Sequence, residues 1–151
     1  MRISTKGHYA VQAMVDMAMQ GALAPVSLSV IAERQDLSQN YLEQLFVKLR
    51  KADLVKSVRG PGGGYMLVRH PEAISIGDIF SAVEENLVLT DCVDQHGAPH
   101  SSCSKSSECR TQALWSRLGQ HFNELLYSIT LADVLKGEFD FSAVSSSRHT
   151  V

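Results

Sequence analysis

The stretch LSQNYLEQLFVKLRKADLVKSVRGPGGGYMLV, residues 37–68, decides the fold. Its first half predicts a helix from residue 39 to about residue 52, with Ser38 as its N-terminal cap. Four apolar residues at helical spacing form the buried stripe of this helix: Leu42, Leu45, Phe46 and Leu49. The second half predicts a β-hairpin, with strands over 54–59 and 65–68 joined by the glycine-rich turn 60–64. The stretch therefore predicts a helix and a hairpin that follow each other without a linker.

Two helices are expected before this stretch. Ser4 or Thr5 caps the first, which reaches about residue 20 and has a broad apolar face rich in methionine, a residue that commonly fills cores. Ser27 caps a short second helix that ends near Arg34, and a tight turn over 35–37 leads into the helix that Ser38 caps. Two helices joined by a short turn and followed by a hairpin are typical of a winged helix-turn-helix domain, which binds DNA.

The fourth expected helix completes this domain, to which we assign residues 1–83. Ser75 and Asp78 have capping-box spacing at the start of a helix from residue 76 to about residue 83. The predicted fold class is therefore mainly α, with a small β-hairpin as the wing of a winged helix-turn-helix.

Beyond residue 109 the sequence predicts a long helix and a short one, together residues 110–136. The long helix is expected to begin at Ser106 or Ser107 and to end near Ile129. Its apolar side is formed by Leu114, Leu118, Phe122, Leu125, Leu126 and Ile129, with Trp115 next to them. This is more apolar surface than one small domain covers, so we expect a dimerisation helix, with an intramolecular core helix as the alternative. Thr130 and Asp133 cap the short helix, and residues 137–151 are expected to form a flexible tail.

Charge is distributed unevenly along the chain. Residues 1–70 contain nine Lys and Arg against five Asp and Glu, a net charge of +4, and the remainder contains five against eleven, a net charge of −6. A basic front half favours a polyanionic partner such as double-stranded DNA. No run approaches the ~20 apolar residues that a membrane-spanning helix needs.

The predicted DNA contacts lie on helix 39–52 and on the hairpin. They are Ser38, Asn40, Tyr41, Glu43, Gln44, Lys48, Arg50, Lys56, Arg59 and Gly60. The amides can read adenine edges and the hydroxyls can reach phosphates. Glu43 can accept from the amino group of cytosine, with a simple surface carboxylate paired to a lysine as the alternative. Arg59 is placed for a narrow minor groove beside Gly60, and the other cations for phosphates.

All three cysteines lie within eighteen residues. Cys92, Cys103 and Cys109 are separated by ten and by five residues, among Gly, Pro, Ser and two histidines. Such a stretch cannot form its own core, and three soft thiolates favour a metal or an iron–sulfur cluster. A disulfide with one remaining thiol is the alternative. No signal peptide precedes the chain, so we expect the reducing cytoplasm. We call residues 84–109 the cysteine segment and predict that it is a cluster-binding loop.

Two enzyme classes are not supported. The turn GPGGGY lacks the Lys-Ser/Thr of a phosphate-binding loop and opens no helix. A nucleophilic cysteine would need a base and an oxyanion site, and no such signature appears. We therefore predict that the protein is not an enzyme.

Five segments together resemble the IscR-type iron–sulfur cluster regulators over residues 1 to about 136. They are MRISTKGHYAVQAM, LSQNYLEQLFVKLRKADLVKSVRGPGGGY, ISIGDIFSAVEE, the three cysteines and RTQALW. The resemblance implies a homodimer crossed by the long helix, bound to a palindromic promoter site. It also implies a [2Fe-2S] or [4Fe-4S] cluster, of which we favour [2Fe-2S], held mainly by the three cysteines. Whether the cluster is bound would control the transcription of cluster-biogenesis genes or of iron and stress genes, by repression or activation.

One position departs from the pattern of that family. A histidine ligand stands in its members where this chain has Gln112, and an amide is a poor iron ligand. The fourth ligand is therefore left open among His96, His100, a solvent molecule, His8 of the partner subunit and Gln112. The alternative function is a regulator of the same fold that uses a thiol-redox switch or structural zinc instead of an iron–sulfur cluster.

Overall fold

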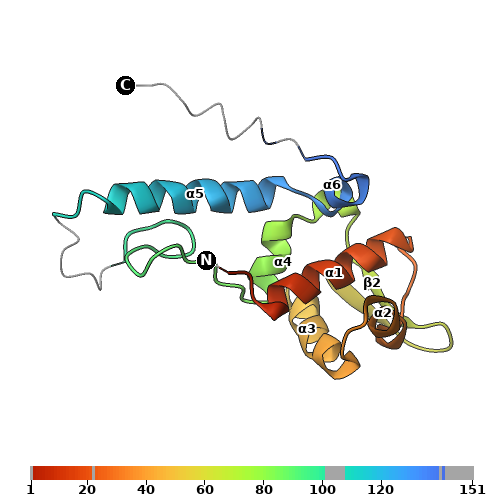
Figure 1. Cartoon of the computed structure of the whole chain (residues 1–151). Coiled ribbons are helices and arrows are strands. Elements are labelled where there is room, and N and C mark those ends of the chain that lie inside the picture. The colour runs from red at the N-terminus through yellow and green to blue at the C-terminus, as the bar shows by residue number, and fades with distance from the viewer. Residues whose placement is uncertain (1, 22, 101–107, 140, 142–151) are drawn as a thin grey trace.

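The structure is a computed structural model that describes residues 2–21, 23–100, 108–139 and 141. Its elements in chain order are α1 (Thr5–Met19), α2 (Leu28–Gln35), α3 (Gln39–Lys51), β1 (Val55–Val58), β2 (Gly64–Leu67), η1 (Pro71–Ala73), α4 (Ile76–Ala82), α5 (Gln112–Ser128) and α6 (Leu131–Lys136). Helices α1 to α4 and the hairpin gather into one body, and α5 extends away from it (Figure 1). The predicted class, mainly α with a small hairpin, is confirmed.

Most predicted caps are present. Ser27 accepts from the N–H of Val30, and Ser38 accepts from the N–H of Tyr41. Complete capping boxes begin α4 and α6, as the pairs Ser75–Asp78 and Thr130–Asp133 predict. The first helix is the exception. Ser4 is at the N-cap position of α1 but makes no side-chain cap, because its hydroxyl donates to a carboxylate from another part of the chain.

The core lies where α1, α2, α3 and α4 meet. Phe46 of α3, Ile31 of α2 and Ile79 of α4 are completely buried there. The methionines of α1 behave as expected with one exception: Met14 and Met17 are in the core, whereas Met19, at the helix end, is 67% exposed. The helix-turn-helix is thus fixed to α1 mainly by buried apolar contacts, the largest stabilising term in small domains.

The hairpin is antiparallel, with Val55 opposite Leu67 and Val58 opposite Gly64. Its turn has Pro61 followed by Gly62 at φ 75°, and the N–H of Gly63 donates to the carbonyl of Gly60 at 2.9 Å. This is the residue order of a type II turn, which needs glycine at its third position. The sequence did not predict an isolated bridge beside this two-stranded sheet: Val26 exchanges two 2.8 Å hydrogen bonds with Tyr65.

The C-terminal helices are tied to the front of α4. The N–H of Ile76 donates to the carbonyl of Ile129 at 2.8 Å, and the N–H of Leu131 donates to the carbonyl of Ile74 at 2.9 Å. Helix α5 begins at Gln112, so the expected start at Ser106 or Ser107 is wrong. Residues 108–111 are turn and coil instead, with the N–H of Gln112 bonded to the carbonyl of Cys109.

Two predictions, for the thiol of Cys103 and for the C-terminal tail, concern residues that lie wholly or partly outside the described part of the chain. Residues 101–107, which include Cys103, lie outside the described part of the chain, as do residue 140 and residues 142–151 of the expected tail. Within the described part, no helix is long and apolar enough to cross a membrane.

Candidate functional site

The N-terminal half of α3 presents a polar face to solvent. Asn40, Glu43 and Gln44 are all exposed there. The side-chain amide of Gln39 donates to the carboxylate of Glu43 at 3.3 Å, so the partner of Glu43 is an amide rather than the lysine considered above. Three polar side chains on one exposed turn can contact base edges in a major groove.

The two hydroxyl residues of this helix end are partly engaged by the protein itself. The hydroxyl of Ser38 caps α3 at 3.4 Å from the N–H of Tyr41. The ring of Tyr41 is half-buried and packs edge-on against Tyr9 of α1, with centroids 6.0 Å apart. Tyr41 therefore also fixes the start of α3 against α1.

The hairpin carries exposed cations beside its glycine turn. Lys56 on β1 and Arg59 at the tip are exposed, and so is Gly60. A Cβ built on Gly60, at φ 98°, meets nothing within 4 Å, so the tip is open on that side. Arg50 is exposed on α3. Predicted DNA-contacting cations are thus exposed both on the hairpin and on α3. Figure 1 shows the hairpin protruding from the body that holds α2 and α3.

A buried carboxylate that sequence reasoning missed positions the helix-turn-helix. Asp16 of α1 is only 3% exposed and accepts from the guanidinium of Arg34 at 3.1 and 2.5 Å. The side chain of Gln35 donates to the same carboxylate at 2.8 Å. These bonds hold the end of α2, directly before the turn into α3. An acidic residue inside an otherwise apolar helix face was the signal that could have revealed it.

Lys48, the other cation of α3 that was predicted to contact DNA, is paired within the protein. The ammonium of Lys48 lies 2.5 Å from the carboxylate of Glu84, which begins the cysteine segment. The ammonium of Lys6 on α1 donates to the backbone carbonyl of Glu84 at 2.6 Å. Hydrogen bonding to Lys48 lowers the pKa of Glu84, and the charges of Lys48, Lys6 and Lys51 lower it further. The cysteine segment thus starts in contact with α1 and α3.

Its second residue, Glu85, is buried at the N-terminus of α1. The carboxylate accepts from the N–H and hydroxyl of Ser4 and from the N–H of Gly7. Burial alone would raise the pKa of Glu85, but these three hydrogen bonds keep it below its ordinary value. A Cβ on Gly7 would come within 2.7 Å of the carboxylate, so any larger residue there would displace the Glu85 side chain. Glu85 therefore caps α1 in place of the side chain of Ser4.

The first thiol lies in a small closed loop. Cys92 is half-buried, its sulfur is 3.0 Å from the hydroxyl of Thr90, and its carbonyl accepts from the N–H of His100. Asp94 orders the tip by accepting from the N–H groups of His96 and Ala98, both at 2.8 Å. The bond from Ala98 lowers the pKa of Asp94, and the bond from His96 adds to this shift.

This loop is packed on α5. The hydroxyl of Ser116 donates to the carbonyl of Gly97. A Cβ on Gly97 would overlap the backbone of Ser116 and lie 2.6 Å from the backbone nitrogen of Gln120. The close approach of loop and helix therefore depends on glycine at 97, whose φ is 77°. The cysteine segment thus contacts α1 and α3 at its start and α5 through the loop around Gly97.

The second described thiol precedes α5. Cys109 is half-buried, and its sulfur is 3.3 Å from the hydroxyl of Thr111. The side-chain nitrogen of Gln112 is buried without a hydrogen-bond partner among the described residues. A buried polar atom without a partner is rare and calls for an explanation such as an ion or water.

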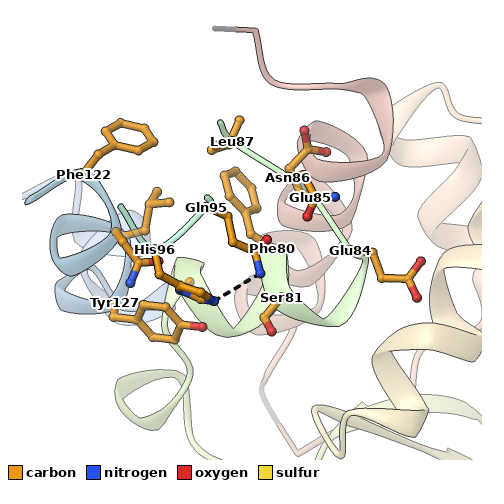
Figure 2. Close-up of a pocket in the computed structure, with 13 residues that line it drawn as sticks. Phe80, Ser81, Glu84, Glu85, Asn86, Leu87, Gln95, His96, Phe122 and Tyr127 are labelled. Atoms are coloured by element: carbon orange, nitrogen blue, oxygen red, sulfur yellow. Dashed lines mark hydrogen bonds between the residues drawn. The ribbon is translucent and has the colours of Figure 1, made fainter. Parts of the chain in front are cut away.

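The histidines considered as fourth ligands lie in different places. His8 is exposed on α1, with its ring 5.6 Å from that of Tyr9. His100 is exposed beside Cys92 in the loop. His96 lines a cavity of about 150 Å³ between α4 and α5. Figure 2 shows it with Gln95 beside the aromatic side chains of this cavity, which are Phe80, Phe122 and Tyr127.

The donor set fits an iron–sulfur cluster in its chemistry. Two thiols, each beside a hydroxyl that can donate to sulfur, provide soft ligands. The side-chain nitrogen of Gln112, buried and without a partner among the described residues, can donate a hydrogen bond of the kind that tunes such clusters. Within the described ranges, no three His, Cys, Asp or Glu side chains are grouped to hold a metal ion, and Cys103 is not among those residues.

An exposed polar face on the second helix of a helix-turn-helix, followed by a basic hairpin, defines a winged helix-turn-helix DNA-binding regulator. The family model of Rrf2, an iron-dependent transcriptional regulator, matches residues 3–137. The chain belongs to the Rrf2 family.

Individual relatives agree with this assignment. The HTH-type transcriptional regulator IscR of Sodalis glossinidius (strain morsitans) is 45% identical over 138 residues, which cover 91% of this chain and 81% of the relative. The structure of T. potens IscR has a TM-score of 0.68 at 42% identity, over 100% of this chain and 94% of that one. CymR, the global cysteine regulator of B. subtilis, has a TM-score of 0.74 at 35% identity, over 92% and 99%.

These comparisons confirm the resemblance to IscR-type regulators and the winged-helix fold. The protein is an iron-dependent, DNA-binding transcription regulator. Its family and its relatives are regulators rather than enzymes, in agreement with the expectation from the sequence.

Proposed function

We propose that the protein is a cytoplasmic homodimer that senses an iron–sulfur cluster and binds a palindromic promoter site. Cys92, Cys103 and Cys109 would hold the cluster, with [2Fe-2S] favoured over [4Fe-4S]. The observation that carries this proposal is the setting of the two described thiols. Each lies beside a threonine hydroxyl, in a segment that joins the DNA-binding body to α5. The promoters are those of cluster-biogenesis or of iron and stress genes.

DNA contact is assigned to the exposed residues of α3 and the hairpin. Asn40, Glu43 and Gln44 would read base edges, and Arg59 would enter the minor groove beside Gly60. The remaining predicted contacts, Ser38, Tyr41, Lys48, Arg50 and Lys56, would bind phosphates. Exposure of the three reading residues on one turn supports this assignment.

Dimerisation is assigned to the first half of α5. Leu114 and Leu118 are 51% and 44% exposed, whereas Phe122, Leu126 and Ile129 pack on the core. Core contacts account for the second half of the helix, and the apolar face that remains exposed on the first half supports the proposal that a partner copy covers it. A two-fold dimer suits a palindromic site.

The switch would act through the cysteine segment. One end of the segment contacts α1 and α3 through Glu84 and Glu85, and its loop is packed on α5 through Gly97. A bound cluster would fix the segment between these two parts, and loss of the cluster would change the spacing of the two α3 helices in the dimer. The fourth ligand is His96, His100, Gln112 or His8 of the partner subunit. The side-chain nitrogen of Gln112, which has no hydrogen-bond partner among the described residues, is a donor, so it supports a hydrogen bond to the cluster rather than a bond to iron.

The test is anaerobic purification of the wild type and of the triple variant Cys92→Ala, Cys103→Ala and Cys109→Ala. The wild type should have visible absorbance with iron and acid-labile sulfide in comparable amounts, and the variant should be colourless. Circular dichroism of both proteins controls for folding. Zinc without sulfide, or a chromophore that survives in the variant, would contradict the proposal. Zinc, or a metal-free thiol switch, would instead support the alternative function.

A further inference from the structure

Glu84 has a backbone conformation that normally belongs to glycine. It follows the C-cap residue of α4, its φ is 57°, and its N–H donates to the carbonyl of Ser81. Helices commonly end with a left-handed residue at this position, and glycine is favoured because a side chain there costs about 1 kcal/mol. A strained non-glycine residue is a reason to ask what its side chain does.

That side chain holds a cation of the DNA-binding helix. The carboxylate of Glu84 is 2.5 Å from the ammonium of Lys48, and the side chains of the two residues are 73% and 40% exposed. Such an exposed ion pair stabilises a fold very little. The pair is therefore poorly explained as a stabilising contact of the fold.

The pair lies within a basic surface. Lys48, Lys51 and Arg69 line one surface groove together with the carboxylates of Glu84 and Asp78, and Lys6 approaches from α1 to bond the backbone of Glu84. An ammonium group binds a carboxylate and a phosphate in the same way, as a point charge. A phosphate of duplex DNA and the carboxylate of Glu84 are therefore alternative partners for Lys48.

We propose that Glu84 is a residue that sets DNA affinity, because its carboxylate competes with a backbone phosphate of double-stranded DNA for Lys48. This rests on the proposed role of α3 in contacting DNA. Glu84 is also the first residue of the cysteine segment, so a movement of the segment would change how firmly Lys48 is held. While the cysteine segment keeps this position, the carboxylate of Glu84 lowers the affinity for DNA, and a movement that separates Glu84 from Lys48 would raise it.

The experiment measures binding to a random-sequence duplex as a function of salt, by fluorescence anisotropy of labelled DNA. Glu84→Gln removes the charge at nearly constant shape, and Glu84→Gly also removes the left-handed strain. Both variants should bind about 3-fold to 10-fold more tightly at low salt, with a log–log salt slope steeper by about 0.9, which corresponds to one additional phosphate contact. The gain should disappear in the Lys48→Ala background.

Asp53→Asn is the matched control. Asp53 is exposed, has a φ of 58° and follows α3, and no ion pair is found for it among the described residues. An unchanged salt slope in both Glu84 variants, an equal gain in Asp53→Asn, or a gain that survives in Lys48→Ala would overturn the proposal. If the wild type itself shows no salt-dependent binding, the assignment of α3 to DNA fails as well. If the wild type binds normally and only the Glu84 variants give an unexpected result, that assignment stands.

Discussion

Two neighbouring carboxylates at the start of the cysteine segment have opposite environments. Glu84 is exposed and paired with a lysine, whereas Glu85 is only 7% exposed and bonded to backbone N–H groups of α1. No pattern in the sequence distinguishes them, because the partners Ser4 and Gly7 are 81 and 78 residues away. Contacts of this range depend on the tertiary fold, and the charge count alone could not predict them.

Replacing Glu85 by glutamine should destabilise the protein by about 1–3 kcal/mol, the cost of leaving buried hydrogen-bonding groups unsatisfied. A glutamine side chain has one acceptor oxygen, so its amide N–H₂ would face the N–H of Gly7 or the groups of Ser4. The free energy of unfolding in urea measures the effect. Glu72→Gln, on the exposed short helix η1, should leave it unchanged. Equal stability of the wild type and Glu85→Gln would show that the three hydrogen bonds contribute nothing.

The same contact predicts a pH dependence. Because the folded protein lowers the pKa of Glu85 below its ordinary value of 4.5, the carboxylate contributes stability above that pH. The contribution is lost as the pH falls through the lower, folded pKa. The stability difference between the wild type and Glu85→Gln should therefore be largest near neutral pH and shrink in acid.

At the scale of elements, the sequence predicted what local chemistry determines. The caps at Ser27, Ser38, Ser75 and Thr130 and the turn at 60–64 were foreseen because each depends on residues a few positions apart. The pairing of distant segments was not foreseen. The bridges of Val26 with Tyr65 and of Ser75 with Thr130 each involve at least one residue outside any predicted strand, and their partners are distant in the sequence. The late start of α5 was missed because serine-rich residues can cap a helix or continue a loop.

Glycine at 64 should be the position of the hairpin most sensitive to substitution. Its φ is 149°, and a Cβ there would overlap the backbone of Val26 and come within 2.7 Å of the nitrogen of Ser27. Gly64→Ala should cost about 3 kcal/mol or more, since it adds a steric clash to the strain and separates the Val26–Tyr65 bridge. The midpoint of urea unfolding measures it.

Gly62→Ala is the control for this prediction. Its φ is 75°, but nothing lies within 4 Å of a Cβ built there, so only the backbone strain of about 1 kcal/mol applies. If Gly64→Ala and Gly62→Ala unfold at the same urea concentration, the close approach of the hairpin to Val26 does not contribute to stability.

For the whole molecule, the arrangement of α5 determines what the cysteine segment can influence. The bridge of Ser75 with Thr130 fixes the far end of α5 to α4, and the loop around Gly97 is packed on its middle. Figure 1 shows the first half of α5 extending beyond the DNA-binding body. An event at the thiols can therefore reach both the DNA-binding body and the exposed half of α5 through contacts that are already formed.

The exposed half of α5 leads to the last prediction, on oligomeric state. Leu114 and Leu118 lie one turn apart on the helix and are 51% and 44% exposed, and exposed apolar patches mark protein–protein contacts. The double variant Leu114→Glu and Leu118→Glu keeps good helix formers but places two charges in the proposed interface, and buried unpaired charges strongly disfavour association. It should be a folded monomer in sedimentation velocity at concentrations where the wild type is a dimer.

Met19→Glu is the control, because Met19 is 67% exposed on α1 and lies outside the proposed interface. It should sediment as the wild type does. The monomeric variant should also bind a palindromic site no more tightly than a single half-site, because the two α3 helices are no longer linked and the gain in effective concentration is lost. If the double variant remains a dimer, the copies meet through another surface, and loss of the cluster could not change the spacing of the two α3 helices through α5.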